Sequence, residues 1–227
     1  MTKTEQLEKL FREWRSRSEG GLFVEDGLLS EKDWNQSGLR VVVLLKEPSE
    51  TNPNATEWKY QDFIRNRQFL EEKGTTWPNL IRWTYGILHG FPPFQEVEEN
   101  LHMISNSTER FFGSVCFVNV KKTAGSTRSN DEIVYQAGIN TGDLLLRQIH
   151  ILEPNIVLCC GSVVFRIVKD SLENHEIPLE PKMTRGGLER IWWNDLRANI
   201  IHYHHPMAFY PKAMTYTYLM NELKSIL

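Results

Sequence analysis

The chain has 227 residues, of which 41% are hydrophobic and 24% charged, and its formal net charge is −3. This length and composition are typical of a globular domain with a substantial core, which excludes a disordered, collagen-like or coiled-coil protein. The 29 acidic residues slightly outnumber the 26 basic ones, so the total charge does not by itself indicate a nucleic-acid partner.

The cysteines and the apolar runs indicate a cytoplasmic protein. Cys116, Cys159 and Cys160 lie inside apolar segments and no CxxC is present, so we expect buried thiols, no disulfide and no cysteine-bound metal. No apolar run approaches the roughly 20 residues of a membrane span, and the N-terminal segment has no signal-peptide core. We expect no membrane association.

The predicted elements alternate between helices and strands. In chain order they are a helix over 7–17, a strand over 40–45, helices over 60–72 and 78–89, a strand over 115–120, a helix from the capping-box pattern at 129–132 toward Pro154, a strand over 156–160, a helix over 162–172, a strand over 199–203 and a helix over 212–226. The segment 188–193, with Trp192 and Trp193, predicts a hairpin or edge strand packed on the sheet.

The four predicted strands are continuously apolar, which is typical of parallel strands buried on both faces. The segments between them are long enough for crossover helices. We therefore predict an α/β fold with three α/β/α layers and a central, mainly parallel four-stranded sheet. Residues 1–227 should form a single domain, with 1–38 as a helical N-terminal extension packed on it.

Polar side chains follow the predicted strands at the edge where ligands of such folds collect. Glu47 and Pro48 come after the first strand, Asn119 ends the second, and His205 with Pro206 follows the last. Each residue alone has a plain structural interpretation: a surface carboxylate, a strand-end amide and a structural imidazole. Their combination predicts a functional site.

These motifs, in this order, resemble those of the uracil-DNA glycosylase superfamily. That superfamily has a motif of GQDPYH or GxNP type after an early strand and one of HPSP type after the last. Here 45–49 (LKEPS) lies over the first motif and 205–209 (HPMAF) over the second. Residues 117–122 (FVNVKK) are similar to the strand whose asparagine reads the base, and 154–162 to a strand and turn of the bacterial members.

The resemblance implies a monofunctional DNA glycosylase, which flips a pyrimidine out of DNA, hydrolyses its N-glycosidic bond and leaves an abasic site. Asn119 would read the base edge, and His205 would stabilise the negative charge that develops on the base. Glu47 would hold the attacking water and stabilise the cationic sugar. No metal or other cofactor is implied. Candidates for stacking on the flipped base are Trp58, Phe63 and Trp77.

DNA contacts follow from the same resemblance. Phe209 takes the place of the family's wedge residue, with Tyr210 beside it, and Pro78 with Asn79 is similar to a phosphate-gripping loop before a helix. From 121 to 130 the chain carries basic residues and no acid, which predicts a basic face. The complete expected DNA-binding set is Pro48, Pro78, Asn79, Lys121, Lys122, Arg128, Ser162, Met207, Phe209 and Lys212.

Several residues depart from the family's pattern. Glu47 is one methylene longer than aspartate, Met207 replaces a phosphate-binding serine, and Thr123 stands where the iron–sulfur branch has cysteine. Ser49 replaces a tyrosine that blocks a 5-methyl group, so a 5-substituted pyrimidine could enter. The expected base is therefore uracil or a 5-modified pyrimidine, such as a modified cytosine of phage DNA, with a role in repair or antiviral defence. The expected enzyme is a monomer.

Two other functions remain open. His202 and His204 share one side of the last strand by the period of two, so with Glu47 they are candidate ligands of a metal-dependent hydrolase, although no HExxH or HxD motif accompanies them. Alternatively, the chain is a catalytically inactive relative that binds DNA or a protein partner. The departures at Glu47 and Met207 favour that reading, whereas the joint presence of carboxylate, asparagine and histidine opposes it.

Overall fold

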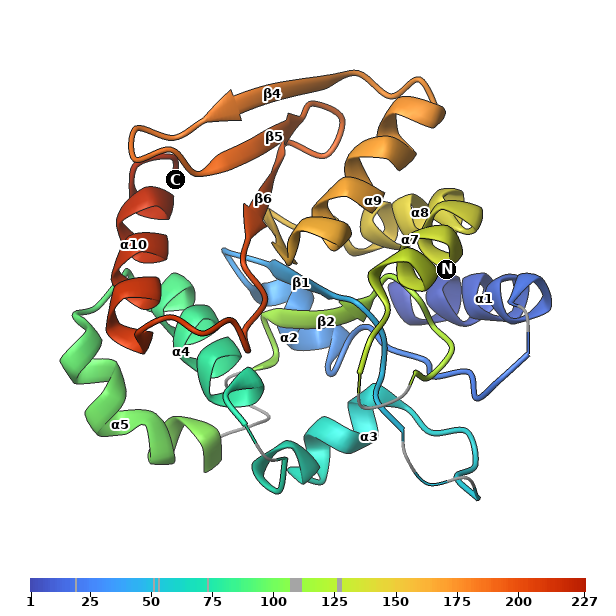
Figure 1. Ribbon diagram of the computed structural model, residues 1–227, viewed down its shortest axis with the longest axis horizontal. Coiled ribbons are helices and arrows are strands. Elements are labelled where there is room, and N and C mark those ends of the chain that lie inside the picture. Colours follow the sequence, from blue (N-terminus) through green and yellow to red (C-terminus); the bar gives the residue numbers. More distant parts are fainter. Residues whose placement is uncertain (19, 51, 53, 73, 107–111, 126–127) are drawn as a thin grey trace.

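The computed structural model describes residues 1–18, 20–50, 52, 54–72, 74–106, 112–125 and 128–227, and it is an α/β fold around a mixed sheet (Figure 1). The six strands described are β1 (Val41–Leu45), β2 (Val115–Asn119), β3 (Ile156–Cys160), β4 (Leu179–Met183), β5 (Glu189–Trp193) and β6 (Ala198–Tyr203). They lie in the order β2-β1-β3-β6-β5-β4. The first four in that order are parallel, and β5 and β4 are antiparallel.

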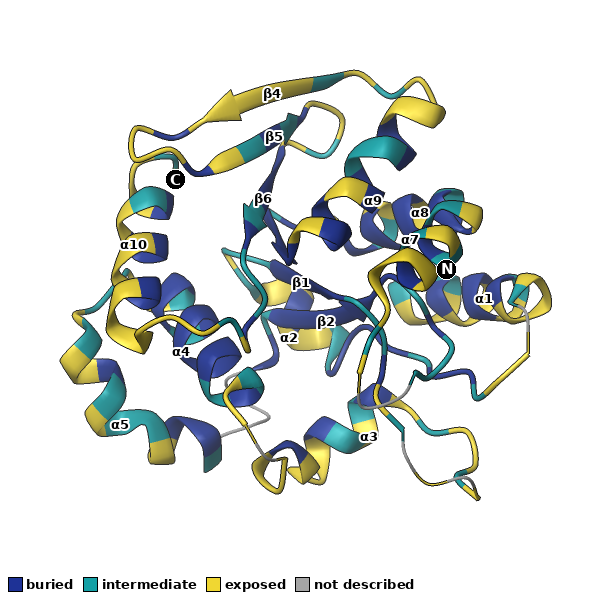
Figure 2. Ribbon diagram, in the orientation of Figure 1, coloured by how far each residue is buried: buried dark blue, intermediate teal, exposed yellow. Residues whose placement is uncertain are grey.

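The predicted parallel sheet is confirmed for its four strands, but the prediction of only four strands is wrong. The segment around Trp192 forms β5, which pairs with β4 and with β6 as a hairpin at the sheet edge. Strand β4 (LEPKM) gave no apolar signal because most of it is exposed, as its yellow colour in Figure 2 shows. Pro181 is tolerated there because β4 is an edge strand.

Helices cover both faces of the sheet. In chain order they are α1 (Lys3–Arg17), α2 (Glu31–Gln36), α3 (Tyr60–Arg65), the 3₁₀ turn η1 (Gln68–Leu70), α4 (Thr76–Leu88), α5 (Phe94–Asn106), α7 (Asp131–Asn140), α8 (Gly142–Leu152), α9 (Ser162–Asn174) and α10 (Lys212–Lys224). None of those in the described part of the chain is long and apolar enough to cross a membrane.

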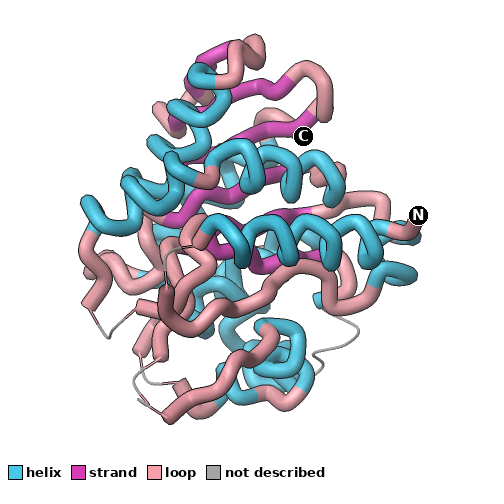
Figure 3. The backbone as a smooth tube through the Cα atoms, turned by 90° about the vertical axis from the view of Figure 1, so that its right-hand side faces the viewer, coloured by secondary structure: helices cyan, strands magenta, loops and turns pink. Residues whose placement is uncertain are grey.

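Two apolar cores form because alternate residues of each buried strand point to opposite faces. Val42 and Leu44 pack with α1, α8 and α9, whereas Val41, Val43 and Phe117 pack with α4 and α10. Figure 3 shows the strands between these helical layers. The three cysteine thiols are free and buried as predicted, and burial raises the pKa of Cys159 and of Cys160.

Two predicted helices are interrupted. The helix expected from 129–132 toward Pro154 divides into α7 and α8 at Thr141, whose backbone leaves the helical region (φ −121°, ψ 23°). Both pieces pack tightly on α9, since a Cβ at Gly138 of α7 would lie 2.7 Å from Ile167 Cδ1 and one at Gly142 of α8 would lie 2.4 Å from the Ser171 hydroxyl. The helix expected over 60–72 ends at Arg65, and Arg67 takes a left-handed conformation (φ 56°) before η1.

Because α4 and α10 are in close contact, we expect one added methyl group at Gly86 to change the stability of the protein. A Cβ at Gly86 of α4 would lie 2.6 Å from the Met220 sulfur and 2.7 Å from the Tyr216 hydroxyl, both on α10. We expect Gly86→Ala to lower the free energy of unfolding by about 1–3 kcal/mol through overpacking, despite the better helix propensity of alanine. Urea denaturation measures this change.

The matched control is Gly38→Ala, because no described atom outside its two chain neighbours lies within 4 Å of a Cβ there. We expect that variant to unfold within about 0.5 kcal/mol of the parent. Equal unfolding midpoints for the two variants would contradict the tight α4–α10 contact.

Candidate active site

Glu47, Asn119 and His205 all lie at the carboxyl edge of the parallel strands. Asn119 is in register with Leu45 across β1 and β2. The pairing continues past the strands, because the Lys121 amide donates to the Lys46 carbonyl at 3.0 Å. His205 follows β6, two strands away from β1. Polar groups from three separate segments therefore converge on one edge.

Gly161, directly after β3, lies between the Lys46 loop after β1 and the His205 turn after β6. A Cβ there would lie 3.9 Å from both Lys46 Cε and His205 Cβ. Its φ of 114° lies in a region that L side chains rarely adopt, so the backbone favours glycine here. A side chain at this position would contact both Lys46 and His205.

Glu47 is held in a single orientation. Its Oε2 accepts from Lys121 Nζ at 2.6 Å and its Oε1 accepts from the Ser129 hydroxyl at 2.7 Å. The Glu47 side chain is only 8% exposed and that of Lys121 only 12%. Gly125 packs against the carboxyl group, since a Cβ there would lie 2.2 Å from the carboxyl carbon. Each carboxylate oxygen retains a lone pair that can accept from a water or a substrate.

The loop after β1 extends the strand pairing and carries Glu47 to this position. The Gly125 amide donates to the Pro48 carbonyl at 2.9 Å and the Glu50 amide to the Gly125 carbonyl at 3.1 Å. Pro48 is buried and Ser49 is exposed. Pro48, expected among the DNA contacts, is therefore not on the surface that DNA could touch.

Ser129 is a site residue that the sequence did not reveal. The capping-box pattern suggested that Ser129 caps the helix, but the N-cap of α7 is Asn130, whose Oδ1 accepts from the amides of Glu132 and Ile133. The Ser129 hydroxyl is thereby available to Glu47. The only indication in the sequence that Ser129 could have another role was the residue that follows it, Asn130, which can also cap a helix.

Asn119 is fully buried, and its side-chain amide has no hydrogen-bond partner among the residues that the structure describes. Its main chain is fully bonded, because the N–H donates to Asp26 Oδ2 at 2.7 Å and the carbonyl accepts from Lys122 Nζ at 2.8 Å. By the period of two, its side chain shares a face with Phe117. An unpartnered buried amide is costly unless a ligand bonds it.

The three predicted stacking residues meet in one aromatic cluster on that face. Trp77 contacts Phe117 at 5.1 Å and Phe63 at 5.5 Å, and Phe63 contacts Trp58 at 5.9 Å, all between ring centroids. Tyr60, which the sequence analysis did not select, stacks on Trp58 at 5.6 Å with an interplanar angle of 22°.

The Tyr60 hydroxyl lies near the Asn119 side-chain amide and interacts with it, but the contact does not have the geometry of a hydrogen bond. Burial raises the pKa of Tyr60, and the Asn119 side chain partly offsets that rise. Tyr60 is therefore a neutral phenol beside the unpartnered amide.

His205 is a neutral imidazole with a defined tautomer. Its Nδ1 accepts from the Met207 amide at 3.1 Å, so the neutral ring carries its hydrogen on Nε2. Burial lowers the pKa of His205, the Lys46 cation lowers it further, and Asp131 acts in the opposite direction. Lys46 in turn donates to Asp131.

Asn79 holds the turn after His205 instead of reaching a phosphate. Its Nδ2 donates to the Pro206 carbonyl at 2.7 Å, and its Oδ1 accepts from Arg82 at 3.0 Å. Arg82 is paired with Glu98 on α5. The side chain is buried with its polar atoms used, so the predicted DNA contact of Asn79 is wrong. Pro78, in the first turn of α4, is partly exposed.

The predicted basic face is also wrong for its two lysines, since each is bound to a carboxylate. Lys122 is buried and paired with Asp26 at 2.7 Å, and Lys121 is paired with Glu47. Arg128 is exposed. The Lys212 side chain is 53% exposed and lies against Glu98. Those two are the basic residues of the predicted set that solvent reaches.

An apolar rim borders the site. Met207 and Tyr210 are exposed, and Phe209 is fully exposed. A large aromatic side chain with no burial is a feature of interaction surfaces. Ser162 is exposed at the N-terminus of α9 and lies 3.1 Å from His202 Nε2.

The predicted pairing of His202 with His204 is wrong. The His202 ring stacks on Phe165 of α9 at 4.7 Å, whereas His204 contacts Trp83 of α4 at 5.3 Å, on the opposite face of the sheet. The period of two does not extend to His204 because β6 ends at Tyr203. Within the described ranges, no group of three or more histidine, cysteine or acidic side chains is placed to hold a metal.

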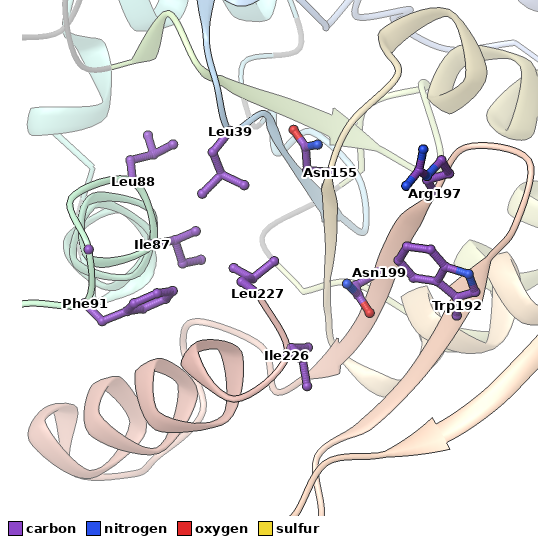
Figure 4. Close-up of a pocket in the computed structure, with 11 residues that line it drawn as sticks. Leu39, Ile87, Leu88, Phe91, Asn155, Trp192, Arg197, Asn199, Ile226 and Leu227 are labelled. Carbon is purple, nitrogen blue, oxygen red and sulfur yellow. The ribbon is translucent and has the colours of Figure 1, made fainter.

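Two cavities lie away from Glu47, Asn119 and His205. One of about 470 Å³ lies at the opposite, amino-terminal edge of the sheet, between Leu39 and Asn155 before β1 and β3, Asn199 near the start of β6, and the last residues of the chain (Figure 4). Another of about 370 Å³ lies between α1 and α7, with Lys121 in its wall.

Comparison with known proteins adds no assignment. Neither a scan against models of protein families nor a search of curated proteins finds a match for this chain. The functional interpretation therefore depends on the residues and their geometry.

The histidines beside the site predict a pH dependence of stability. Burial, with a smaller contribution from His205, lowers the pKa of His204 from 6.5 to about 4. Between these values the unfolded chain binds a proton that the folded protein does not, so the free energy of unfolding falls as pH decreases from about 6.5 to about 4. We expect His204→Phe, which preserves the ring contact with Trp83, to flatten this dependence.

Urea denaturation at several pH values between about 4 and 7 measures the difference between the two proteins. An identical pH dependence in the parent and in His204→Phe would contradict the burial of a neutral imidazole at this position.

Proposed function

We propose that this protein is a DNA glycosylase that hydrolyses the N-glycosidic bond of a flipped pyrimidine nucleotide and leaves an abasic site. The observation that carries the proposal is the convergence of a fixed carboxylate, an unpartnered buried amide and a neutral imidazole at one edge of the sheet. Fold stability requires none of these features. Their order along the chain is that of the uracil-DNA glycosylase superfamily.

The base would enter beside Asn119. Its free amide offers one acceptor and two donors to the edge of a pyrimidine, and the hydrogen bonds would offset the cost of leaving this group buried and unpartnered. The aromatic cluster of Trp58, Tyr60, Phe63 and Trp77 supplies apolar surface on the same face. A flipped base is commonly read in this way, by edge contacts and stacking.

The imidazole and the carboxylate would act on the two sides of the breaking bond. As the C1′–N1 bond breaks, its electron pair passes to the base, and the Nε2–H of neutral His205 donates to the oxygen where charge develops. Water attacks C1′ and gives its proton to Glu47, whose negative charge also stabilises the cationic sugar. Lys121 and Ser129 fix the carboxylate for that task.

The exposed residues of the rim would bind the DNA. Phe209, which is fully exposed, would fill the space that the flipped base leaves in the helix, with Met207 beside it. Arg128, Lys212, Ser162 and the first turn of α4 at Pro78 would face phosphates. With so few basic side chains, we expect weak and salt-sensitive non-specific binding. The proposed enzyme is a cytoplasmic monomer that needs no metal or other cofactor.

The substrate would be uracil or a 5-modified pyrimidine. Ser49 is small and exposed where the superfamily has a blocking tyrosine, which favours bases with a 5-substituent, including modified cytosines of phage DNA. Repair and antiviral defence are the corresponding roles.

A panel of oligonucleotides tests the activity. We expect alkali-labile abasic sites in DNA that carries uracil, mismatched thymine or a 5-substituted cytosine, with the same rate in EDTA. Rescue of chelated protein by a divalent ion would instead favour a metal-dependent hydrolase. Binding of DNA without cleavage of any base would favour the catalytically inactive alternative.

Substitutions of the two reacting side chains test the mechanism. We expect Glu47→Gln and His205→Ala each to lower the single-turnover rate by about 10²–10⁴-fold with little change in DNA affinity, because both act in the transition state. Matched controls are Glu180→Gln on the exposed hairpin and His150→Ala on α8, which should retain full activity. Full activity in Glu47→Gln or His205→Ala would remove that residue from the mechanism.

A further inference from the structure

Asp26 and Lys122 form a completely buried ion pair beside the candidate site. Lys122 Nζ lies 2.7 Å from both Asp26 oxygens, and both side chains are 0% exposed. Gln148 Nε2 donates to Asp26 Oδ1 at 2.8 Å. The Lys122 ammonium also lies 4.5 Å from the centre of the Trp14 ring. Every strong donor and acceptor of the pair is therefore used.

The ion pair is hydrogen-bonded to both main-chain polar groups of Asn119. Asp26 Oδ2 accepts from the Asn119 N–H at 2.7 Å, and Lys122 Nζ donates to the Asn119 carbonyl at 2.8 Å. The chain is thus fixed on both sides of the Asn119 Cα. The Asn119 side chain, in contrast, has no hydrogen bond of good geometry to a described residue and lies near the Tyr60 hydroxyl, so its direction depends chiefly on the main chain that carries it.

Stability alone is a poor explanation for this pair. Removing two charges from water is costly, and apolar residues of similar size often serve a fold as well or better. Asp26 lies in the loop before Gly27, which bridges to Phe117 of β2. The loop at Asp26 and strand β2, which are far apart in the sequence, are therefore joined at Asn119, the residue that carries the unpartnered amide.

We infer that Asp26 and Lys122 are positioning residues, which hold the amide of Asn119 in the orientation that reads the base. This inference rests on the proposed function, because it assigns the use of the amide to pyrimidine recognition. A misplacement of about 1 Å in such a group can cost on the order of a hundredfold in rate. It should also weaken discrimination between pyrimidines that differ in amino or carbonyl groups on that edge.

The double variant Asp26→Asn, Lys122→Met tests the inference without leaving a buried charge unpaired. We expect it to fold, to lower the single-turnover rate on the preferred base by on the order of a hundredfold, and to lower discrimination between uracil and cytosine by about tenfold. The matched control is Leu172→Ala, a destabilising change in the core on α9. It should lower the melting temperature with no change in discrimination.

A second measurement does not depend on activity. In NMR spectra of the free protein we expect one pair of Asn119 side-chain NH₂ resonances in the parent and in Leu172→Ala, but broadened or multiple resonances in the double variant. Hydrogen exchange of the Asn119 backbone amide should also be faster there. If the double variant fails to fold, Gln148→Leu, which removes one hydrogen bond from Asp26 and leaves the ion pair intact, should show the same NMR changes to a smaller degree.

The two measurements separate the possible failures. If the parent cleaves no base, the proposed function fails, and the Asn119 resonances still decide whether the ion pair orders the amide. Unchanged Asn119 resonances and unchanged discrimination in the double variant, with only a lower melting temperature, would overturn the positioning role.

Discussion

Two consecutive lysines, each bound to a carboxylate from another part of the chain, are the constraint on which the site depends. Lys121 pairs with Glu47, from the loop after β1, and Lys122 pairs with Asp26, which lies 96 residues earlier. Both lysines follow β2 after a single residue, Val120. One short segment therefore fixes the carboxylate that would act on the sugar and the main chain of the amide that would read the base.

This arrangement prepares the site before any ligand binds. Glu47 is held by Lys121, Ser129 and the backbone of Gly125, and the His205 turn is held by Asn79. The Asn119 side-chain amide, in contrast, has no hydrogen-bond partner among the residues that the structure describes. A site whose side chains are already fixed loses little conformational entropy when it binds a ligand, so more of the binding energy can stabilise the transition state. A buried unpartnered amide lowers stability, and such costs are typical of functional positions.

The sequence predicted the features that depend on local pattern. Continuous apolar runs predicted β1, β2, β3 and β6, and the strand ends indicated Glu47, Asn119 and His205, which lie at one edge. It could not predict the partners of charged residues. Lys121 and Lys122 suggested a basic surface, because the acids that bind them are distant in the chain. Strand β4 was missed because an exposed edge strand needs no apolar pattern, and His204 was misplaced because the strand ends one residue before it.

Release of a free base is the most direct test of the central claim, because it reports the bond that breaks whatever base is preferred. DNA containing uracil and phage DNA containing modified cytosines would be incubated with the protein, and the small molecules released would be identified by mass spectrometry. The account predicts a free pyrimidine base and an abasic strand of unchanged length, with no base released by Glu47→Gln. Release of nucleotides, or of the same base by Glu47→Gln, would contradict it.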